Sequence, residues 1–417
     1  MKIAIIGSGI AGITLAHHLY KNHKISIFEA LSHIGGHTHT HAIELEGKSY
    51  AVDTGFIVFN DRTYPEFIAL LAQHNVTWQD SQMSFSVRCE KTGLEYNGTT
   101  LNSLFAQRSN LFRPSFYKMI RDILRFNQQS LALLNDGNEI SMGDYLQQNH
   151  YGQRFIDQYI IPMGAAIWST DAAQMLQFPA RFFVRFFHHH GMLSVNNRPQ
   201  WRTITGGSAR YVEALTEKFK HRIQLNTPVK SVKRHANHVE ISLENGNTEP
   251  FDYVFFACHS DQALAMLQDA TNAETEILAA IPYQKNEVFL HTDASLMPAR
   301  KLAWAAWNYH LPKVASNQVA VTYNMNILQN IDCPQPILVT LNHTDQINPA
   351  KIIKRLHYMH PVYTLLGAAA QARHAEISGK NRTGYAGAYW QNGFHEDGVK
   401  SALTALQHFE SFTQNVQ

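Results

Sequence analysis

The sequence predicts an α/β protein in which a parallel-sheet domain is interleaved with a second, mixed α+β domain. A short apolar strand at 2–6 runs into a glycine turn and a helix at 10–21, and another apolar strand follows at 24–29. Strand patterns return between 201 and 257, after a long helical stretch, and the chain closes with a glycine turn and an amphipathic helix at 384–412. Strands that alternate with helices are typical of parallel sheets with crossover connections.

The segments between these elements have patterns of their own. The expected strands lie at 49–59, 201–205, 222–225, 229–233, 238–243 and 252–257, a hairpin at 80–98, and mixed strands at 283–345. The expected helices lie at 64–73, 116–127 and 142–147, within the helical stretch 62–190, and at 208–219. We therefore expect one discontinuous domain, a parallel sheet with a β-meander, made of 1–60, 200–265 and 375–417. The second, substrate-binding and largely helical domain would contain 61–199 and 266–374.

Composition excludes several classes of protein. The chain has 417 residues, of which 45% are hydrophobic and 16% charged, and this balance favours two or three well-buried globular units over a disordered or fibrous protein. A net charge of +2 without a Lys/Arg run gives no reason to expect a nucleic-acid partner. The N-terminus has no signal-peptide pattern, and no apolar stretch approaches the roughly 18 residues of a spanning helix. We expect a cytoplasmic protein that at most contacts the inner membrane face peripherally.

Cysteine and histidine usage indicates neither disulfides nor a metal site. Cys89, Cys258 and Cys333 are far apart and fit a reducing compartment. The 24 histidines occur in groups, but without ligand spacing on a recognisable scaffold. We interpret most of them as surface or packing residues, and expect no metal.

The glycine turn after the first strand predicts dinucleotide binding. Gly7, Gly9 and Gly12 form G-x-G-x-x-G, with Ile10 and Ala11 opening the helix, and Glu29 ends the next strand. In a Rossmann-type unit the first glycine permits a tight turn, the second lets a pyrophosphate approach, and the third lets helix and strand pack closely. The helix N-terminus attracts phosphate, and an acid such as Glu29 binds ribose hydroxyls and disfavours NADP. The alternative is a strand-turn-helix whose glycines serve packing only.

A second glycine pair points to a flavin. Gly35 and Gly36 follow Glu29 in Ala-Leu-Ser-His-Ile-Gly-Gly-His-Thr. Here the sequence resembles the flavin amine oxidase superfamily, which includes carotenoid desaturases and protoporphyrinogen oxidase. The resemblance implies non-covalent FAD, with this turn along the pyrophosphate. The residues it would place there are Ala30, Gly35, Gly36, His37 and Thr38, and His37 stands where the family usually has Arg.

The resemblance recurs further along the chain. Asp53-Thr54-Gly55 resembles the family's Asp-x-Gly, and Thr227–Val232 resembles the adenine segment, with Val229 as the contact. Residues 385–388 and 393–402 resemble the closing flavin motif, which implies cofactor contacts from Gly387, Ala388, Gly393, Phe394, Asp397 and Val399. The usual acid is Ala388 here, so Asp397 is the alternative ribityl contact, or simply an acid at a helix start. The matches run from Lys2 to Ala402, and the sequence is similar to a bacterial group of predicted NAD/FAD-binding proteins.

Four residues are candidates for chemistry beside the flavin. The resemblance makes Phe394 one wall of a substrate cage and puts Lys285 near a flavin-linked lysine. Trp168 ends a small-residue segment that could approach the ring, and His395 could assist proton removal. Each has a plainer interpretation: core packing for the aromatics, a surface position for Lys285, and a hydrogen bond to the flavin for His395.

The substrate class is inferred from the apolar character of the presumed substrate cage and from the resemblance to desaturases. Arg181–His190 alternates aromatics with bases, which fits either a membrane-surface patch or, by preference, a buried helix with two arginines at its rim. We expect an FAD-dependent dehydrogenase or desaturase that acts on a fatty acyl or isoprenoid chain. A flavin amine oxidase and a redox-neutral flavin-binding isomerase or partner protein are the alternatives. Oxygen, a quinone and a nicotinamide all stay open as the electron acceptor.

Overall fold

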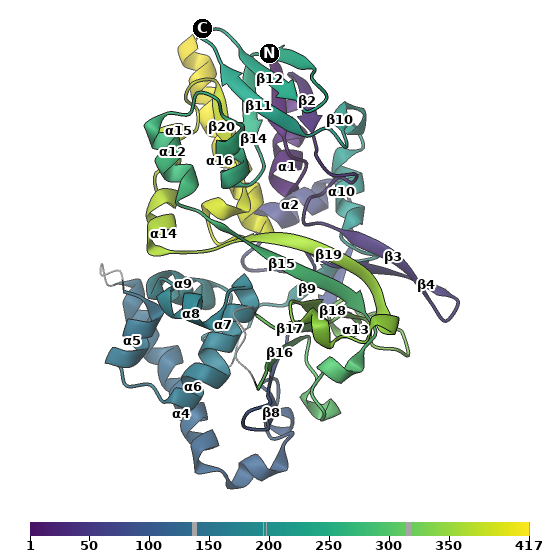
Figure 1. Cartoon of the computed structure of the whole chain (residues 1–417), viewed down its shortest axis with the longest axis vertical. Coiled ribbons are helices and arrows are strands. Elements are labelled where there is room, and N and C mark those ends of the chain that lie inside the picture. Colours follow the sequence, from purple (N-terminus) through teal and green to yellow (C-terminus); the bar gives the residue numbers. More distant parts are fainter. Residues whose placement is uncertain (136–139, 195, 197, 314–318, 417) are drawn as a thin grey trace.

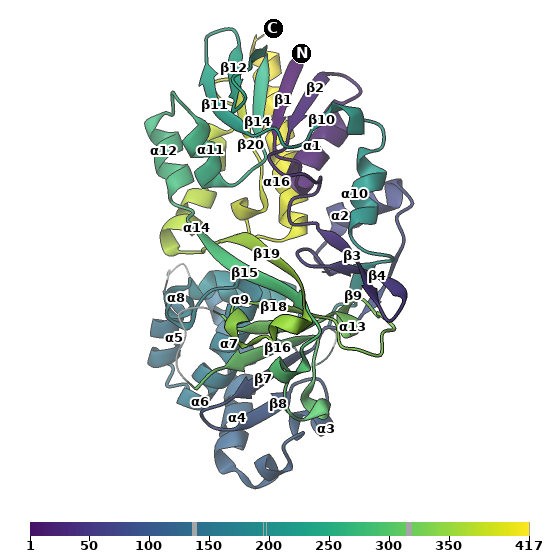
Figure 2. The ribbon, with the colours of Figure 1, turned by 45° about the vertical axis from the view of Figure 1, so that its right-hand side comes forward.

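A computed structural model describes residues 1–135, 140–194, 196, 198–313 and 319–416 (Figure 1). Residues 136–139 of the predicted helical stretch and 314–318 of the predicted mixed stretch lie outside the described residues. The two ends of the chain lie together at one pole of the molecule, and a largely helical region forms the other pole (Figures 1 and 2).

The upper part is built around a five-stranded parallel sheet, in the order β10-β2-β1-β14-β20. Its strands are β1 (Lys2–Ile6), β2 (Lys24–Phe28), β10 (Ile223–Gln224), β14 (Tyr253–Phe256) and β20 (Thr383–Tyr385). Segments from the start, middle and end of the chain therefore lie side by side in one sheet. This confirms the predicted α/β class, while the domain boundaries stay a prediction.

Alternate residues of these strands enter two different cores, because successive side chains of a strand point to opposite faces. Ile3 and Ile5 pack with one set of helices: α1 (Ile10–Leu19), α2 (Pro65–Gln73), α10 (Ala209–Thr216) and α16 (His395–Val416). Ala4 and Ile6 pack with the opposite layer. That layer contains the meander β11 (Val229–Arg234), β12 (Val239–Leu243) and β13 (Thr248–Phe251) with α11 (Ser260–Met266) and α12 (Asn272–Ala279).

A seven-stranded sheet organises the lower part, in the order β19-β15-β18-β17-β16-β7-β8. Its strands are β7 (Phe85–Cys89), β8 (Leu94–Asn97), β15 (Tyr283–His291), β16 (Trp307–Leu311), β17 (Val321–Asn324), β18 (Leu338–Leu341) and β19 (Ile352–Pro361). Neighbouring strands are antiparallel except β7 and β16. The long strands β15 and β19 cross the middle of the molecule, between its two parts (Figures 1 and 2).

Helices cover this sheet and enclose a large apolar core with it. They are α3 (Leu101–Leu104), α4 (Pro114–Gln129), α5 (Met142–Gln148), α6 (Gln153–Phe155), α7 (Ile161–Trp168), α8 (Ala172–Gln177) and α9 (Ala180–His189). The aromatic residues of α9 are buried, whereas Arg181 is half-buried and Arg185 exposed. The buried-helix interpretation of this segment is therefore confirmed, and the membrane-patch alternative is wrong because its phenylalanines face the core.

Smaller elements complete the chain: the hairpin β3 (Thr40–Leu45) and β4 (Lys48–Asp53), the sheet β5 (Phe59–Asn60), β9 (Trp201–Ile204) and β6 (Trp78–Ser81), and the helices α13 (Met325–Leu328), α14 (Leu365–Gln371) and α15 (His374–Ile377). The predicted hairpin at 80–98 is β7 and β8, but β6 pairs with β9 instead. Strands β3 and β19 were missed because neither contains an apolar run.

Candidate functional site

In the loop between β1 and α1, backbone atoms fill the space beside Gly7 and Gly12, whereas the space beside Gly9 is open. A Cβ on Gly12 would stand 2.0 Å from the carbonyl oxygen of Gly7, and Gly7 itself has φ +104°. A Cβ on Gly9, in contrast, would meet no atom within 4 Å. The first turn of α1 has no side-chain cap, so its N–H groups point into this open space.

Glu29 is fixed beside this loop. One carboxylate oxygen accepts hydrogen bonds from the Ser8 N–H at 2.8 Å and the Ser8 hydroxyl at 2.7 Å, and the other accepts from the Leu31 N–H at 2.8 Å. The exposed Ala30 follows it. The Thr227 N–H bonds to the Glu29 carbonyl at 2.8 Å and thereby brings the start of β11, with Val229, next to this acid. The structure thus brings together the predicted ribose and adenine residues.

The two glycine turns are in direct contact. Gly9 and Gly35 form an isolated β-bridge, and the Gly35 N–H donates to the Ser8 carbonyl at 3.0 Å. Gly36 has φ +59°, and a Cβ there would stand 3.2 Å from the Gly9 Cα. A side chain on Gly36 would therefore crowd Gly9, whereas one on Gly35 would collide with the Thr38 carbonyl oxygen at 2.6 Å.

His37 carries an enclosed nitrogen, because its Nε2 has no hydrogen-bond partner. Its ring centroid lies 5.2 Å from that of Tyr358, 5.5 Å from His360 and 6.2 Å from His259. Burial, together with the neighbouring His259, lowers the pKa of His37 to about 4. A half-buried, neutral imidazole with an enclosed, unused nitrogen is suited to bind a polar group of a ligand.

Sequence reasoning missed the partners of His37. His259 is the third residue after the buried strand β14, at the carboxyl edge of the parallel sheet, where ligands bind in folds of this type. Tyr358 and His360 alternate on β19, and this period of two was a usable signal. Burial lowers the pKa of His259 to about 4 and that of His360 to about 3.

The start of α16 packs against the start of α1. A Cβ on Gly398 would approach Ile10 Cγ2 to 2.6 Å and Ala388 Cβ to 3.9 Å, and Val399 is buried in the same core. The Gly387 N–H donates to the Ser401 hydroxyl at 2.8 Å. Two helix N-termini from opposite ends of the chain therefore converge here. We call the Gly7–Gly12 loop, Glu29, the turn 35–38 and the start of α16 the cofactor cradle.

The polar residues that open α16 bond to three different partners. His395 Nε2 lies 2.9 Å from the Thr38 hydroxyl and 2.7 Å from the Tyr211 hydroxyl, and its ring stacks on Phe56 at 3.6 Å. Burial and the nearby His37 lower its pKa. The Asp397 carboxylate accepts from the Phe394 N–H at 2.9 Å, which fits the helix-start interpretation of this acid. His395 thus holds Thr38 and the glycine turn in place.

Glu396 links the same helix to α2. Its two carboxylate oxygens accept from the N–H groups of Glu66 at 3.2 Å and Phe67 at 2.9 Å, in the first turn of α2. Lys400 Nζ lies 3.2 Å from the same carboxylate. This contact fixes the angle at which α16 enters the cradle.

Phe394 lies at the seam between the two large cores and contacts both. It is half-buried, and its ring stacks on Phe186 of α9 at 4.9 Å and 25°. Trp168 packs behind, 4.9 Å from Phe186, and its Nε1 donates to the Asn392 carbonyl at 3.3 Å. Gly393 has φ +91° and faces the Tyr363 hydroxyl. Phe394, Phe186 and Trp168 therefore form an aromatic wall beside the start of α16.

Lys285 is an exposed residue inside β15, opposite Met359 in the register with β19. The strand begins at Tyr283, two residues before the lysine. Tyr283 shares the face of β15 on which Lys285 stands, and its ring stacks on His259 at 4.3 Å. Because side chains alternate along a strand, Lys285 and Met359 point to the face opposite that of Tyr358 and His360, and the structure does not bring Lys285 into the His37 cluster.

The Asp-x-Gly segment, residues 53–55, packs against the turn 35–38 of the cofactor cradle. Asp53 is fully buried and accepts from the Ser208 N–H and hydroxyl, the latter at 2.8 Å, and from Gln329 Nε2 at 2.9 Å. A Cβ on Gly55 would stand 2.0 Å from the His37 carbonyl oxygen, so only glycine permits this approach. The segment locks the turn 35–38 onto α10.

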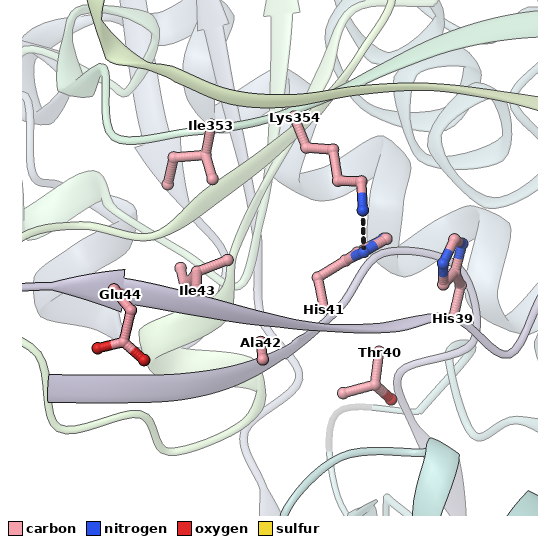
Figure 3. Close-up of a pocket in the computed structure, with 8 residues that line it drawn as sticks. All are labelled: His39, Thr40, His41, Ala42, Ile43, Glu44, Ile353 and Lys354. Carbon is pink, nitrogen blue, oxygen red and sulfur yellow. Dashed lines mark hydrogen bonds between the residues drawn. The ribbon is translucent and has the colours of Figure 1, made fainter.

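An open groove of about 610 Å³ borders the cradle between β3 and β19 (Figure 3). Lys354 reaches from β19 to His41, with 3.0 Å between Nζ and Nδ1. From His41 Nε2 the hydrogen bonds continue to the Thr54 hydroxyl at 3.1 Å and on to the Tyr358 hydroxyl at 2.7 Å. This chain of polar groups joins the groove to the cluster around His37.

Metal ligation finds no support in the part of the chain that the structure describes, where no three His, Cys, Asp or Glu side chains gather as a metal site. Within the same residues, no helix combines the length and apolar character that crossing a membrane requires.

Comparison with known proteins identifies the class. The sequence profile of the flavin-containing amine oxidoreductases matches residues 10–315, which is more than half of the chain. The chain therefore belongs to the flavin-containing amine oxidoreductase family. It is a flavoenzyme, an oxidoreductase that binds FAD, as the glycine motifs predicted. The comparison with curated proteins gives no match.

Solved structures share the fold at low sequence identity. Cyclohexylamine oxidase from Brevibacterium oxydans IH-35A has 12% identity and a TM-score of 0.70, with 98% of this chain and 99% of that chain covered. A protein assigned as a protoporphyrinogen oxidase from Exiguobacterium sp. 255-15 has 16% identity and a TM-score of 0.70, with 98% of each chain covered. A fatty acid isomerase from P. acnes that produces CLA has 16% identity and a TM-score of 0.67, again with 98% of each covered.

The residues of the cradle fit FAD. The space before Gly9 is open, the first turn of α1 is uncapped, and His37 Nε2 is enclosed without a partner. The first two features leave backbone N–H donors of the glycine loop and α1 unused beside the turn 35–38, and the third adds a polar side-chain atom without a partner at that turn. A diphosphate supplies the acceptors that such donors require.

Proposed function

We propose that this flavoenzyme is a dehydrogenase or desaturase that removes a hydride from an apolar, lipid-like molecule, a fatty acyl or isoprenoid chain. FAD, when bound, supplies the hydride acceptor, and the protein orients the substrate and excludes water. The observation that carries the proposal is the aromatic wall. Phe394 stacks nearly parallel on Phe186 at 4.9 Å, which leaves no room for a substrate between the two rings.

The aromatic wall presents an apolar surface to a molecule bound beside it. Its indole N–H is already used by the Asn392 carbonyl, and Phe178 and Phe182 extend it with further carbon at 4.6 and 6.2 Å from Trp168. Tyr389 and Trp390, the other aromatics of the closing motif, lie in the core on the far side of the five-stranded sheet. A cationic amine would have no facing pair of rings here, whereas an alkyl chain would gain apolar contact.

The candidate residues take different roles in this proposal. Phe394 contacts the substrate, and Trp168 positions it through Phe186. His395 positions the glycine turn through Thr38, because both of its closest polar partners are protein hydroxyls. Lys285 is exposed on the β15 face opposite Tyr358 and His360, which favours the surface interpretation of this lysine over a contact with the flavin.

The test is an anaerobic half-reaction. The purified, FAD-loaded protein is mixed with long-chain fatty acids, isoprenoid lipids and a panel of amines while the visible flavin absorbance is followed. We expect a lipid to bleach the flavin and the amines to leave it oxidised. Bleaching by an amine alone, with peroxide formed on admission of air, would instead assign an amine oxidase.

A matched pair of variants locates the substrate. Phe394→Ser should slow lipid-driven bleaching at least about tenfold, because it removes most of an apolar contact surface, while Phe394→Leu should stay within a few-fold of the parent. FAD binding should be unchanged in both. Equal rates in all three proteins would remove Phe394 from the substrate site.

Two further outcomes are informative. The fatty acid isomerase with this fold acts, by its name, on a fatty acid without net redox change. A lipid product with a moved double bond and a flavin that ends oxidised would assign an isomerase to this chain as well. If a lipid does bleach the flavin, the relative rates of reoxidation by oxygen, a quinone and a nicotinamide identify the acceptor.

A further inference from the structure

The pole opposite the chain termini carries large apolar side chains that are largely or about half exposed. Exposed fractions are 77% for Leu101, 43% for Leu111 and 87% for Phe112, on α3 and the turn that follows it. Tyr117 and Leu124 on α4 are exposed by 47% and 48%. Isolated exposed apolar residues are ordinary on a protein surface, but five within 24 consecutive positions mark an interaction surface.

These residues belong to one surface. The Tyr117 hydroxyl donates to the Leu111 carbonyl at 3.1 Å, and Arg108 donates to the Asn102 carbonyl at 3.3 Å. Helix α4 buries Phe116, Met119 and Phe126 against the core, so its exposed apolar residues lie on the opposite side. The turn and the outer side of α4 thus form a continuous face, which we call the α3–α4 face.

The same face is strongly basic. Residues 100–125 contain Arg108, Arg113, Lys118, Arg121 and Arg125 against the single acid Asp122, whereas the whole chain has a net charge of only +2. Among the described residues, the only ion pair recorded for these bases joins Arg125 and Asp122. An anionic bilayer has negatively charged headgroups at its surface and apolar acyl chains beneath them. Exposed apolar side chains interspersed with cations complement such a surface.

We propose that the α3–α4 face docks this protein on an anionic phospholipid membrane, with Leu101, Leu111 and Phe112 inserted below the headgroups and the bases among the phosphates. A membrane-docked enzyme would take a lipid-like substrate from the bilayer, and this part of the inference rests on the proposed function. The docking itself does not, because it requires no chemistry at the flavin.

Vesicle sedimentation tests the docking. The full-length, FAD-loaded protein is pelleted with vesicles of phosphatidylcholine alone or with phosphatidylglycerol added. We expect binding to the anionic vesicles, weaker binding to neutral ones, and weakening with salt. Leu101→Ser with Phe112→Ser should reduce the partition coefficient at least about tenfold. Lys118→Glu with Arg121→Glu should reduce it about tenfold or more, on anionic vesicles only.

Matched controls stand elsewhere on the surface. Leu366 on α14 is exposed by the same 77% as Leu101, and Lys218 and Lys220 are exposed beside α10. Leu366→Ser and the pair Lys218→Glu with Lys220→Glu should leave binding unchanged. Equal losses in the controls, or no binding to either vesicle, would overturn the proposal. So would a concentration-dependent dimer that Phe112→Ser dissociates, because a second copy would then cover the face.

Failure of the docking and failure of the proposed function can be told apart. If docking serves substrate access, Leu101→Ser with Phe112→Ser slows flavin bleaching by a lipid embedded in vesicles but not by the same lipid in detergent. Vesicle binding without bleaching by any lipid would retain the docking and refute the lipid substrate. Bleaching of vesicle-embedded lipid at the parental rate in that variant would refute a role of the docking in substrate access, whereas the docking itself is decided by sedimentation.

Discussion

Gly9 and Gly12 are two glycines of one motif with opposite surroundings. Gly9 faces open space and Gly12 faces a backbone oxygen, so the first is free for a ligand and the second is required by packing. The packing role predicted for Gly12 is confirmed, since a Cβ there would collide with the Gly7 carbonyl, while the pyrophosphate role of Gly9 stays a prediction. Sequence reasoning did not pair His259, Tyr358 and His360 with His37, because they approach it from elements hundreds of residues away and a local pattern does not show which elements meet.

Gly9→Ala separates cofactor binding from folding. The added methyl meets no protein atom, so the melting temperature of the apoprotein should stay within about two degrees of the parent. The methyl would occupy the path of the pyrophosphate, and the FAD dissociation constant should rise at least about tenfold, as measured by flavin fluorescence titration. Gly12→Ala is the contrast and should fail to fold stably. An unchanged FAD affinity in Gly9→Ala would contradict this account of the cradle.

His395→Phe tests whether this histidine positions or catalyses. The phenyl ring can keep the stack on Phe56, but the Thr38 and Tyr211 hydroxyls lose their buried partner, at a cost of about 1–3 kcal/mol in unfolding free energy. The pH profile of flavin reduction should keep its shape. Loss of an ionisation from that profile, with stability unchanged, would instead make His395 the base.

The local pattern of apolar residues was sufficient to predict some helices, but it was not sufficient to predict every strand. The expected helices at 64–73 and 116–127 are α2 and α4, whose apolar residues recur every three or four positions. Strand β19 reads Ile-Ile-Lys-Arg-Leu-His-Tyr-Met-His-Pro, which is too polar to indicate a strand, and it forms because β15 pairs along its length. Register of this kind depends on contacts across the fold, which a local pattern does not contain.

Glu396→Gln tests the contact between α16 and α2. The substitution keeps the shape of the side chain but removes the negative charge at the N-terminus of α2 and the pair with Lys400. We expect the free energy of unfolding to fall by about 1–2 kcal/mol in urea titrations. Glu376→Gln, which loses only an exposed pair with Arg373, should lower the free energy of unfolding by less than Glu396→Gln does. Equal losses of unfolding free energy in the two variants would show that the contact of Glu396 with α2 does not stabilise the protein more than an exposed ion pair.

At the scale of the molecule, the two ends of the chain return to the same domain because both contribute to the cofactor cradle. One end supplies the glycine loop, the other supplies the start of α16, and the five-stranded sheet can form only when both are present. The order of the motifs along the sequence was enough to predict this arrangement. The placement of β15 and β19 between the two parts was not predictable, because it depends on how two finished cores meet.

Buried histidines make the whole protein sensitive to acid. Burial is the largest cause in each case and lowers the pKa to about 4 or 3 in His37, His190, His259, His291, His360 and His374. These imidazoles are neutral when folded but accept protons near pH 6.5 when unfolded, so acid favours the unfolded state. Each can lower stability by about 1.4 kcal/mol per pH unit in between.

We therefore expect the free energy of unfolding to fall by several kcal/mol between pH 6.5 and pH 4, in urea titrations at fixed ionic strength. Asp53 and Asp397 act in the opposite direction, because burial raises each pKa to about 6. Two carboxyl groups offset only part of the effect of six imidazoles. Stability that is constant or rises over this range would show that the histidines are solvated rather than buried.

The most direct test of the account is the fate of the flavin when the purified protein is denatured with acid. The cradle predicts about one FAD per folded chain, held by hydrogen bonds and packing alone, so the yellow colour should pass into the supernatant as intact FAD. A protein that is colourless and takes up no FAD would contradict the cradle itself. Colour that stays with the precipitate would contradict non-covalent binding.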